Sequence, residues 1–116
     1  MGTKSGDSSL FAYGALMRGD QVRELLGRNA ASTRARLAGY ERGYARCYFI
    51  RVRAGATTQG RMLHGLSQSD FAILDKFEDV PRLYTRERIE VTGASGALVN
   101  CWVYLPTGWE RVESAR

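Results

Sequence analysis

A capping-box pattern followed by an alternating strand constrains the fold of this chain more than any other feature. Ser67 and Asp70 have the spacing of a capping box, so we expect a helix that starts near Gln68 and runs to Phe77. Pro81 then prevents any continuation of that helix, because proline lacks the backbone N–H and clashes with the preceding turn. The sequence therefore predicts a short helix that turns into a strand.

The position of Glu78 relative to the apolar arc of this helix is unusual. The arc consists of Phe71, Ile73, Leu74 and Phe77, and at about 100° per residue Glu78 falls between Phe71 and Leu74 on the core-facing side. Burial and the negative end of the helix dipole would both raise its pKa, which makes it a candidate general base. The alternative is a frayed last-turn residue that faces solvent, and helix geometry leaves both interpretations open.

The N-terminal part predicts a strand, a turn and a helix. We expect residues 1–9 to be a disordered lead-in, because they are small and polar. Residues 10–13 form an apolar run that favours a buried strand, and Gly14 interrupts it. A glycine at such a turn lets the main chain approach a ligand closely. Asp20 is expected to cap a brief helix that ends at Gly27.

The middle of the chain predicts further strands. Alternation favours one strand over Thr33–Leu37 and another over Tyr44–Val52. A loop is expected at 54–58, followed by a strand through Met62–Leu66. Seven arginines lie between positions 34 and 61, and alternation with apolar residues should send them to the solvent face.

The C-terminal part predicts a β-hairpin. Tyr84–Val91 alternates, a turn is expected at 93–96, and Ala97–Leu105 supplies the partner strand. The residues after Pro106 read as a polar tail.

Composition favours one domain without a membrane span or a metal. The 116 residues are 44% hydrophobic, enough for a single core. No apolar run approaches the roughly 20 residues of a transmembrane helix, and the first residues lack a signal-peptide pattern, so we expect a cytoplasmic protein. Cys47 and Cys101 should be reduced core thiols. With His64 as the only histidine, they form no ligand cluster, so neither a metal nor a cofactor is expected.

The charge indicates an anionic partner without identifying it. The formal net charge is +5, and only Lys4 and Lys76 among the 17 basic residues are lysine. Nucleic acid and a small acidic substrate would both be attracted by this field.

Two motifs carry a resemblance to a known family. Residues Leu74–Glu78, then Pro81, then Leu83–Arg86 resemble the signature of the gamma-glutamylcyclotransferase-like superfamily, most closely its gamma-glutamylamine cyclotransferase branch. The turn Tyr13-Gly14-Ala15-Leu16 is similar to the Tyr-Gly-Ser/Thr-Leu loop of that family. Here Ala15 replaces the usual hydroxyl residue. The resemblance covers Leu10–Leu16 and Gly60–Leu105 and is weakest between them.

The resemblance implies a fold, a reaction and roles for six residues. The fold would be α+β, a small mixed β-barrel-like sheet with two short helices, forming a single domain over residues 10–116. The reaction would release 5-oxoproline and a free amine from a small-molecule gamma-glutamyl amine or amino acid. Glu78 would be the catalytic acid/base, and the main chain of Tyr13, Gly14, Ala15 and Leu16 would bind substrate. Tyr84 would hold the carboxylate or the substrate, although a purely structural place in the core stays open.

Two alternatives remain at this stage. Arg42-Gly43-Tyr44-Ala45, with Phe49 four places on, satisfies part of the RNP1 pattern of an RRM, which would make the chain an RNA-binding module. However, Arg46 stands where that motif has a stacking aromatic residue. The second alternative is a catalytically silent, metabolite-binding relative of the cyclotransferases. We therefore expect no specific nucleic-acid partner, and the sequence does not determine the oligomeric state.

Overall fold

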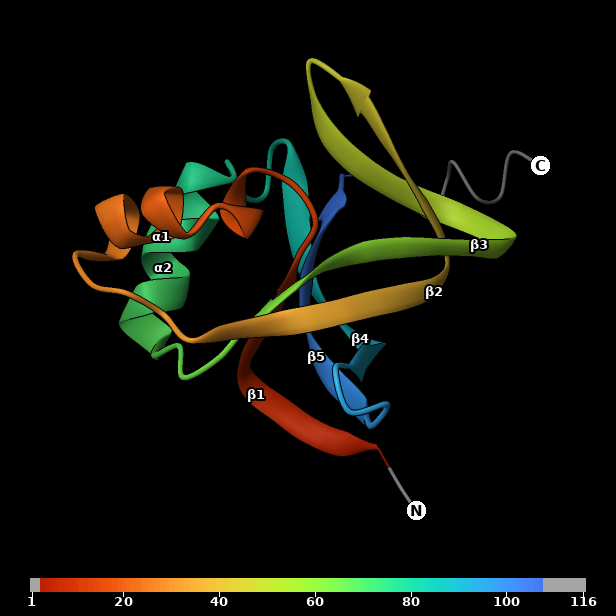
Figure 1. Ribbon diagram of the computed structural model, residues 1–116. Coiled ribbons are helices and arrows are strands. Elements are labelled where there is room, and N and C mark those ends of the chain that lie inside the picture. Colours follow the sequence, from red (N-terminus) through yellow and green to blue (C-terminus); the bar gives the residue numbers. More distant parts are fainter. Residues whose placement is uncertain (1–2, 108–116) are drawn as a thin grey trace.

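Five strands close a small barrel in the computed structural model, which describes residues 3–107 (Figure 1). The strands are β1 (Lys4–Ala12), β2 (Ser32–Ala45), β3 (Cys47–Leu63), β4 (Tyr84–Gly93) and β5 (Leu98–Pro106). They follow the order β1-β3-β2-β4-β5, and β5 pairs with β1 to complete the barrel. The β1–β5 pair is parallel and the other pairs are antiparallel.

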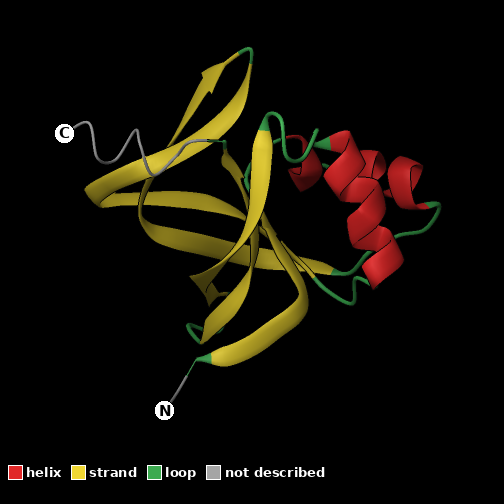
Figure 2. Cartoon of the chain, turned by 180° about the vertical axis from the view of Figure 1, so that it is seen from behind, coloured by secondary structure: helices red, strands yellow, loops and turns green. Residues whose placement is uncertain are grey.

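The helices gather on one side of the barrel, as Figure 2 shows. They are the 3-10 helix η1 (Ala15–Met17) and the α-helices α1 (Gly19–Leu26) and α2 (Gln68–Phe77). This arrangement confirms the prediction of an α+β fold with a barrel-like sheet and two short helices, to which the structure adds η1. Within residues 3–107, no helix is long and apolar enough to cross a membrane.

Strand β1 contributes residues to both hydrophobic clusters of the protein. Leu10 and Ala12 belong to the cluster that contains residues of α1 and α2, whereas Phe11 and Tyr13 belong to the cluster inside the barrel. Successive side chains of a strand point to opposite faces, so a strand that is covered on both faces needs a continuous apolar run. The run at 10–13 therefore reflects a strand between the helical layer and the barrel interior.

Helix α2 begins and ends as its sequence predicts. The Ser67 hydroxyl accepts from the Asp70 N–H at 3.1 Å, and an Asp70 carboxylate oxygen accepts from the Ser67 N–H at 2.9 Å, which completes the capping box. These hydrogen bonds, led by the one from the Ser67 N–H, hold the pKa of Asp70 below its ordinary value, and the ion pair with Arg28 lowers it further. Phe71 and Leu74 are buried on the barrel-facing side.

The predicted hairpin of β4 and β5 is also present. Thr85 pairs with Leu105, and the register continues without interruption to Thr92 and Leu98. The expected turn closes with the N–H of Gly93 donating to the carbonyl of Ala97 at 2.8 Å.

The two strands expected at 33–37 and 44–52 are instead parts of one long hairpin. Ala45 and Cys47 are paired, so the chain reverses at Arg46, within the run predicted as a single strand. The predicted loop at 54–58 lies inside β3, where the register changes from Tyr40↔Val52 to Ala38↔Thr57. Residues 53–56 thus stand opposite Gly39 alone, which has a φ of 85°. Figure 1 shows the hairpin changing direction sharply at this irregularity.

The N-terminal segment corrects a second expectation. Residues 4–9, which were expected to belong to a disordered lead-in, are part of β1, and Lys4 and Gly6 are partnered by Val99 and Cys101 of β5. Parallel pairing with β5 satisfies the hydrogen-bonding groups of the backbone in this polar segment. No local sequence pattern indicates a pairing partner that is so far away in the chain. Residues 1–2 of the expected lead-in and the predicted polar tail from 108 onward lie outside the described residues.

Helix α1 differs from prediction at its start and agrees at its end. Asp20 lies in the first turn rather than at the N-cap, which is Arg18, and the two side chains form an ion pair at 3.0 Å. Gly27 ends the helix in the left-handed conformation, with a φ of 74°. Glycine adopts this conformation without a Cβ penalty, which explains the agreement.

Candidate active site

A cavity of about 340 Å³ opens where the β1–η1 turn, the tip of the β2–β3 hairpin and the α2–β4 connection meet. Its wall consists of Phe11, Ala12, Tyr13, Gly14, Ala15, Leu16, Tyr44, Arg46, Cys47, Tyr48, Phe77, Glu78, Leu83, Tyr84 and Tyr104. All six residues that the sequence singled out are in this wall. The structure thus brings together two motifs that are more than sixty residues apart in the chain.

Glu78 is the acidic residue of the cavity wall, at the C-cap of α2. Its backbone N–H donates to the Leu74 carbonyl at 2.9 Å, so the last helical turn positions the side chain. Burial raises the pKa of the Glu78 carboxyl to about 7. The chain therefore places a weakly acidic carboxyl group beside the cavity, and the alternative of a solvent-facing, frayed residue does not describe it.

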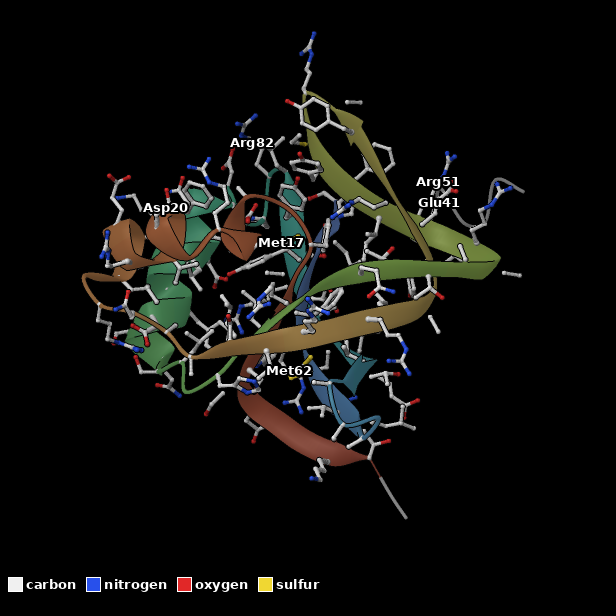
Figure 3. The ribbon with its side chains drawn as sticks, in the orientation of Figure 1. Met17, Asp20, Glu41, Arg51, Met62 and Arg82 are labelled. Atoms are coloured by element: carbon white, nitrogen blue, oxygen red, sulfur yellow. The ribbon has the colours of Figure 1, made fainter. Side chains whose placement is uncertain are left out.

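The neighbouring arginines are committed to other carboxylates. Arg82 pairs with Asp79, and Arg86 pairs with Asp75 at 2.8 Å (Figure 3 labels Arg82). Among residues 3–107, the structure shows no ion-pair partner for Glu78. The carboxylate is therefore available to a ligand in the cavity.

The Tyr13–Leu16 turn forms the wall that β1 contributes. The Tyr13 hydroxyl donates to the Tyr104 carbonyl at 2.5 Å, which ties the turn to β5. A Cβ on Gly14 would lie 3.0 Å from the Cβ of Tyr48, so a larger residue would displace the hairpin tip. The Gly14 carbonyl accepts from the Met17 N–H at 2.9 Å, which starts η1. The close approach of the Tyr48 side chain, rather than a positive φ, explains the glycine at this turn.

Three tyrosines surround the carboxylate. Burial is the largest cause of the raised pKa of Tyr13, Tyr84 and Tyr104, and the nearby Glu78 carboxylate raises each of them further. The Tyr84 hydroxyl donates to the Tyr48 carbonyl, so Tyr84 also holds the hairpin tip. These phenols stay protonated at any physiological pH and can act only as neutral hydrogen-bonding groups.

An ion-pair network fastens the end of α2 to the barrel. Asp75 accepts from Arg86 Nε at 2.8 Å and from Nη2 at 3.1 Å, and its Oδ1 also accepts from the Tyr104 hydroxyl at 2.7 Å. The Arg86 guanidinium lies 4.5 Å from the Phe71 ring centre and 4.3 Å from that of Trp102. A bidentate pair of this kind fixes orientation as well as distance. It therefore holds the helix end that carries the catalytic candidate.

The hairpin tip is the part of the site that sequence reasoning missed. Tyr44, Arg46, Cys47 and Tyr48 all line the cavity, although no functional role was expected for this region. Arg42 supports them by donating to the Tyr13 carbonyl at 3.0 Å. The only signal in the sequence was the aromatic RNP1-like run, which suggested a different fold.

That run does not form an RRM strand. Residues 42–49 span both sides of the hairpin turn at Arg46. The sheet is a closed five-stranded barrel, whereas an RRM has a four-stranded sheet whose aromatics stack bases. The resemblance of this segment to RNP1 is therefore a coincidence of composition.

The remaining arginines of the hairpin mostly face solvent, as predicted. Arg51 pairs with Glu41 at 2.6 Å, and Figure 3 shows this pair on the side of the hairpin away from the helices. Arg61 is the half-buried exception, and its Nη2 donates to the Ser32 hydroxyl at 2.9 Å.

The two cysteines are free thiols in different surroundings. Cys101 is buried in the core, as predicted, whereas the half-buried Cys47 lines the cavity and corrects the expectation of a second core thiol. Burial raises the pKa of Cys101 to about 11, so it stays protonated. His64 Nε2 lies 2.8 Å from Thr33 Oγ1, as expected for a satisfied histidine outside the site.

Comparison with known proteins adds independent information. The family model described as gamma-glutamyl cyclotransferase, AIG2-like, matches residues 10–116. A Methanocaldococcus jannaschii protein, named as a gamma-glutamylcyclotransferase and candidate RNase, is 29% identical over 108 residues, which cover 88% of this chain and 47% of that protein. AIG2-like protein D of Arabidopsis thaliana is 36% identical over 86 residues, which cover 72% of this chain and 55% of that protein.

A solved structure supports the fold. A gamma-glutamyl cyclotransferase structure superposes with a TM-score of 0.77 at 20% identity, and the match covers 86% of this chain and 66% of that one. The chain spans about half the length of the curated relatives it matches.

Proposed function

Because the chain belongs to the gamma-glutamyl cyclotransferase, AIG2-like family, we propose that it converts a gamma-glutamyl amine or gamma-glutamyl amino acid to 5-oxoproline and a free amine. The observation that carries the proposal is Glu78, whose pKa of about 7 and place in the cavity wall suit a proton shuttle. The relatives named as cyclotransferases support the reaction class.

In the proposed reaction, the substrate supplies its own nucleophile. The alpha-amine attacks the gamma-carbonyl carbon, a new C–N bond closes the five-membered ring, and the original amide C–N bond breaks. No water is consumed, and no serine, cysteine or metal is required. Holding the substrate in a folded conformer converts the attack into a well-oriented intramolecular step, which can supply a large part of the acceleration.

Glu78 would move one proton in each direction. Its carboxylate accepts a proton from the alpha-ammonium, which frees the nitrogen lone pair for attack, and the resulting carboxylic acid protonates the leaving nitrogen. Transfer by a positioned group of this kind contributes typically about 10² to 10⁴ in rate. A pKa near 7 suits both roles at neutral pH, because both protonation states are populated.

The Tyr13–Leu16 turn would bind the charged part of the substrate. Main-chain N–H groups of Gly14, Ala15 and Leu16 are proposed to donate to the substrate carboxylate or to the oxyanion of the tetrahedral intermediate. Main-chain donors do not depend on the side chain at position 15, which explains how Ala15 can replace Ser or Thr. Tyr84 would orient the carboxylate or the substrate with its hydroxyl group.

The test is chromatographic detection of 5-oxoproline with a panel of gamma-glutamyl amines and dipeptides. Wild type should release it, and Glu78→Gln should lose turnover by about 10² or more while it still binds substrate. Glu87→Gln is the matched control, because Glu87 is exposed on β4 and does not line the cavity. A fully active Glu78→Gln variant would contradict the assignment of Glu78 as the shuttle.

A second candidate is a metabolite-binding protein without turnover. Ala15, where the family usually has a hydroxyl residue, is the observation that favours it. In that case calorimetry would detect binding of gamma-glutamyl compounds to wild type, and no 5-oxoproline would form.

The two free cysteines fit the proposed cytoplasmic location, where thiols stay reduced.

A further inference from the structure

The rim of the cavity concentrates the exposed apolar surface of the protein. Six large hydrophobic residues are exposed among residues 3–107, and four of them line this cavity. These four, which we call the apolar rim, are Tyr44, Tyr48, Phe77 and Leu83, with exposed fractions of 66%, 42%, 40% and 45%. Exposed apolar groups that gather at the mouth of a cavity mark a surface that a ligand covers.

The rim comes from two parts of the chain, the tip of the β2–β3 hairpin and the α2–β4 connection. Tyr44 and Tyr48 lie on opposite strands of the hairpin tip, with ring centres 4.9 Å apart in an edge-to-face arrangement. Phe77 and Leu83 flank Glu78 on the α2–β4 side. Both parts line the same cavity as Glu78, so a group bonded to the reacting carbonyl can contact them.

Arg46 is the cation of this opening. It forms the turn between Ala45 and Cys47 and has a φ of 70°, a left-handed conformation that is unfavourable for a non-glycine residue. A glycine or asparagine would suit the turn better, so the backbone by itself does not explain arginine. Strained residues of this kind cluster at ligand-binding sites.

Arg46 has no ion-pair partner among the residues that the structure describes. Arg42 and Arg51 on the same hairpin, by contrast, bind a carbonyl and a carboxylate. Arg46 and Glu78 both line the cavity, and no ion pair joins them. Within residues 3–107, the opening therefore combines an apolar surface with a positive charge that no ion pair neutralises.

We propose that the apolar rim and Arg46 form the leaving-group subsite, which selects gamma-glutamyl derivatives of amino acids with bulky apolar side chains. The proposal rests on the proposed cyclotransferase function. In such a substrate the carbon next to the scissile nitrogen bears both a carboxylate and an apolar side chain. The carboxylate would bind Arg46, and the side chain would cover Tyr44, Tyr48, Phe77 and Leu83. A cationic leaving group would be repelled by Arg46.

The size of the cavity agrees with this division. A volume of about 340 Å³ is at the low end of the roughly 300–1,000 Å³ of small-molecule sites, and the apolar rim lines the same space as Glu78. With the glutamyl group beside Glu78 and the Tyr13–Leu16 turn, the leaving amino acid would lie against the rim. A gamma-glutamyl amino acid has two carboxylates, one on the leaving amino acid and one on the alpha-carbon of the glutamyl group. The proposal assigns Arg46 to the first, and the alternative assigns it to the second, which every gamma-glutamyl substrate shares.

Three substrates separate the two contributions. Gamma-glutamyl-phenylalanine carries both groups, gamma-glutamyl-phenethylamine lacks only the carboxylate, and gamma-glutamyl-glycine lacks only the side chain. We expect wild-type kcat/KM for the phenylalanine compound to exceed that for the phenethylamine compound about fivefold, as an exposed ion pair permits. It should exceed that for the glycine compound roughly tenfold, because covering the ring removes apolar surface from water.

Two matched variants identify the cation. Arg46→Asn removes the charge and keeps a residue that tolerates the left-handed conformation. Arg36→Asn removes the same charge from an exposed position of β2 that does not line the cavity. We expect the preference for phenylalanine over phenethylamine to fall to about one in Arg46→Asn and to stay at the wild-type value in Arg36→Asn. Tyr44→Ala should reduce only the preference for phenylalanine over glycine.

The outcomes distinguish this inference from the proposed function. An equal loss of kcat/KM on all three substrates in Arg46→Asn would overturn the inference, because it would assign Arg46 to the shared alpha-carboxylate. A wild-type preference for phenethylamine, or for gamma-glutamyl-1,5-diaminopentane with its cationic leaving group, would overturn it as well, and both results would leave the cyclotransferase reaction standing. Absence of 5-oxoproline from every substrate would overturn the proposed function and this inference together.

Discussion

Replacing Glu78 by Gln removes an ionisable group from the cavity wall while it keeps the size of the side chain. Burial raises the pKa of this carboxyl from the ordinary 4.5 to about 7 in the folded protein. Between those values the folded state binds a proton that the unfolded state has released. The free energy of unfolding of wild type therefore falls as the pH rises through this window, since stability falls wherever the native state binds more protons.

The magnitude follows from the size of the shift. The rise from 4.5 to about 7, at about 1.4 kcal/mol per pH unit, corresponds to an upper bound on the order of 3 kcal/mol. Water in the open cavity screens part of this cost, so we expect about 2 kcal/mol. The Gln variant has no such dependence at this site. It should match wild type near pH 4.5 and be more stable by about 2 kcal/mol above pH 8.

Urea unfolding followed by tryptophan fluorescence at several pH values measures the difference directly. The exposed Glu87→Gln variant serves as the control and should follow wild type at every pH. The reasoning would be refuted if Glu78→Gln were less stable than wild type at pH 8, or if the difference did not change with pH. Either result would mean that the carboxylate makes a stabilising interaction in the folded protein and is structural.

Four further predictions concern activity, stability and binding. The kcat/KM should rise with pH through about 7 as Glu78 ionises, and a flat profile would argue against a base with this pKa. Ala15→Thr should leave turnover within about tenfold of wild type, because main-chain donors dominate the turn, and a far larger gain would show an impaired loop. Arg86→Met should lower the free energy of unfolding by about 2 kcal/mol by leaving Asp75 unpaired, as thermal unfolding would show. Filter binding should find only weak, non-specific RNA binding that is lost at moderate salt, whereas a sequence-selective, salt-resistant complex would contradict the enzyme proposal.

Elements with strong local signals could be read from the sequence. The capping box of α2, the Gly27 stop of α1 and the β4–β5 hairpin all depend on residues within a few positions of one another. Their physical causes, which are side-chain caps, a left-handed glycine and alternation, act along the chain. Helix periodicity placed Glu78 between Phe71 and Leu74, but it left open whether the side chain is buried or faces solvent, and the structure decided this.

Elements that depend on distant partners could not be predicted from the sequence. Residues 4–9 have no apolar alternation, and they form a strand because β5, some ninety residues later, supplies the backbone partner. The change of register at Gly39 bends the long hairpin, and neither the bend nor the approach of Tyr48 to Gly14 leaves a local pattern. The hairpin tip was therefore absent from the predicted site.

The sequence by itself determined that a carboxylate ends a core-facing helix and that a glycine turn follows a buried strand. Only the tertiary structure decided that the two lie in one cavity and that Arg82 and Arg86 pair with Asp79 and Asp75. It also placed Arg46, which has no ion-pair partner within residues 3–107, in the wall of that cavity. The physical reason is the range of the forces. Caps and periodicity act over a few residues, whereas burial, and with it the raised pKa of Glu78, exists only once the barrel closes around the site.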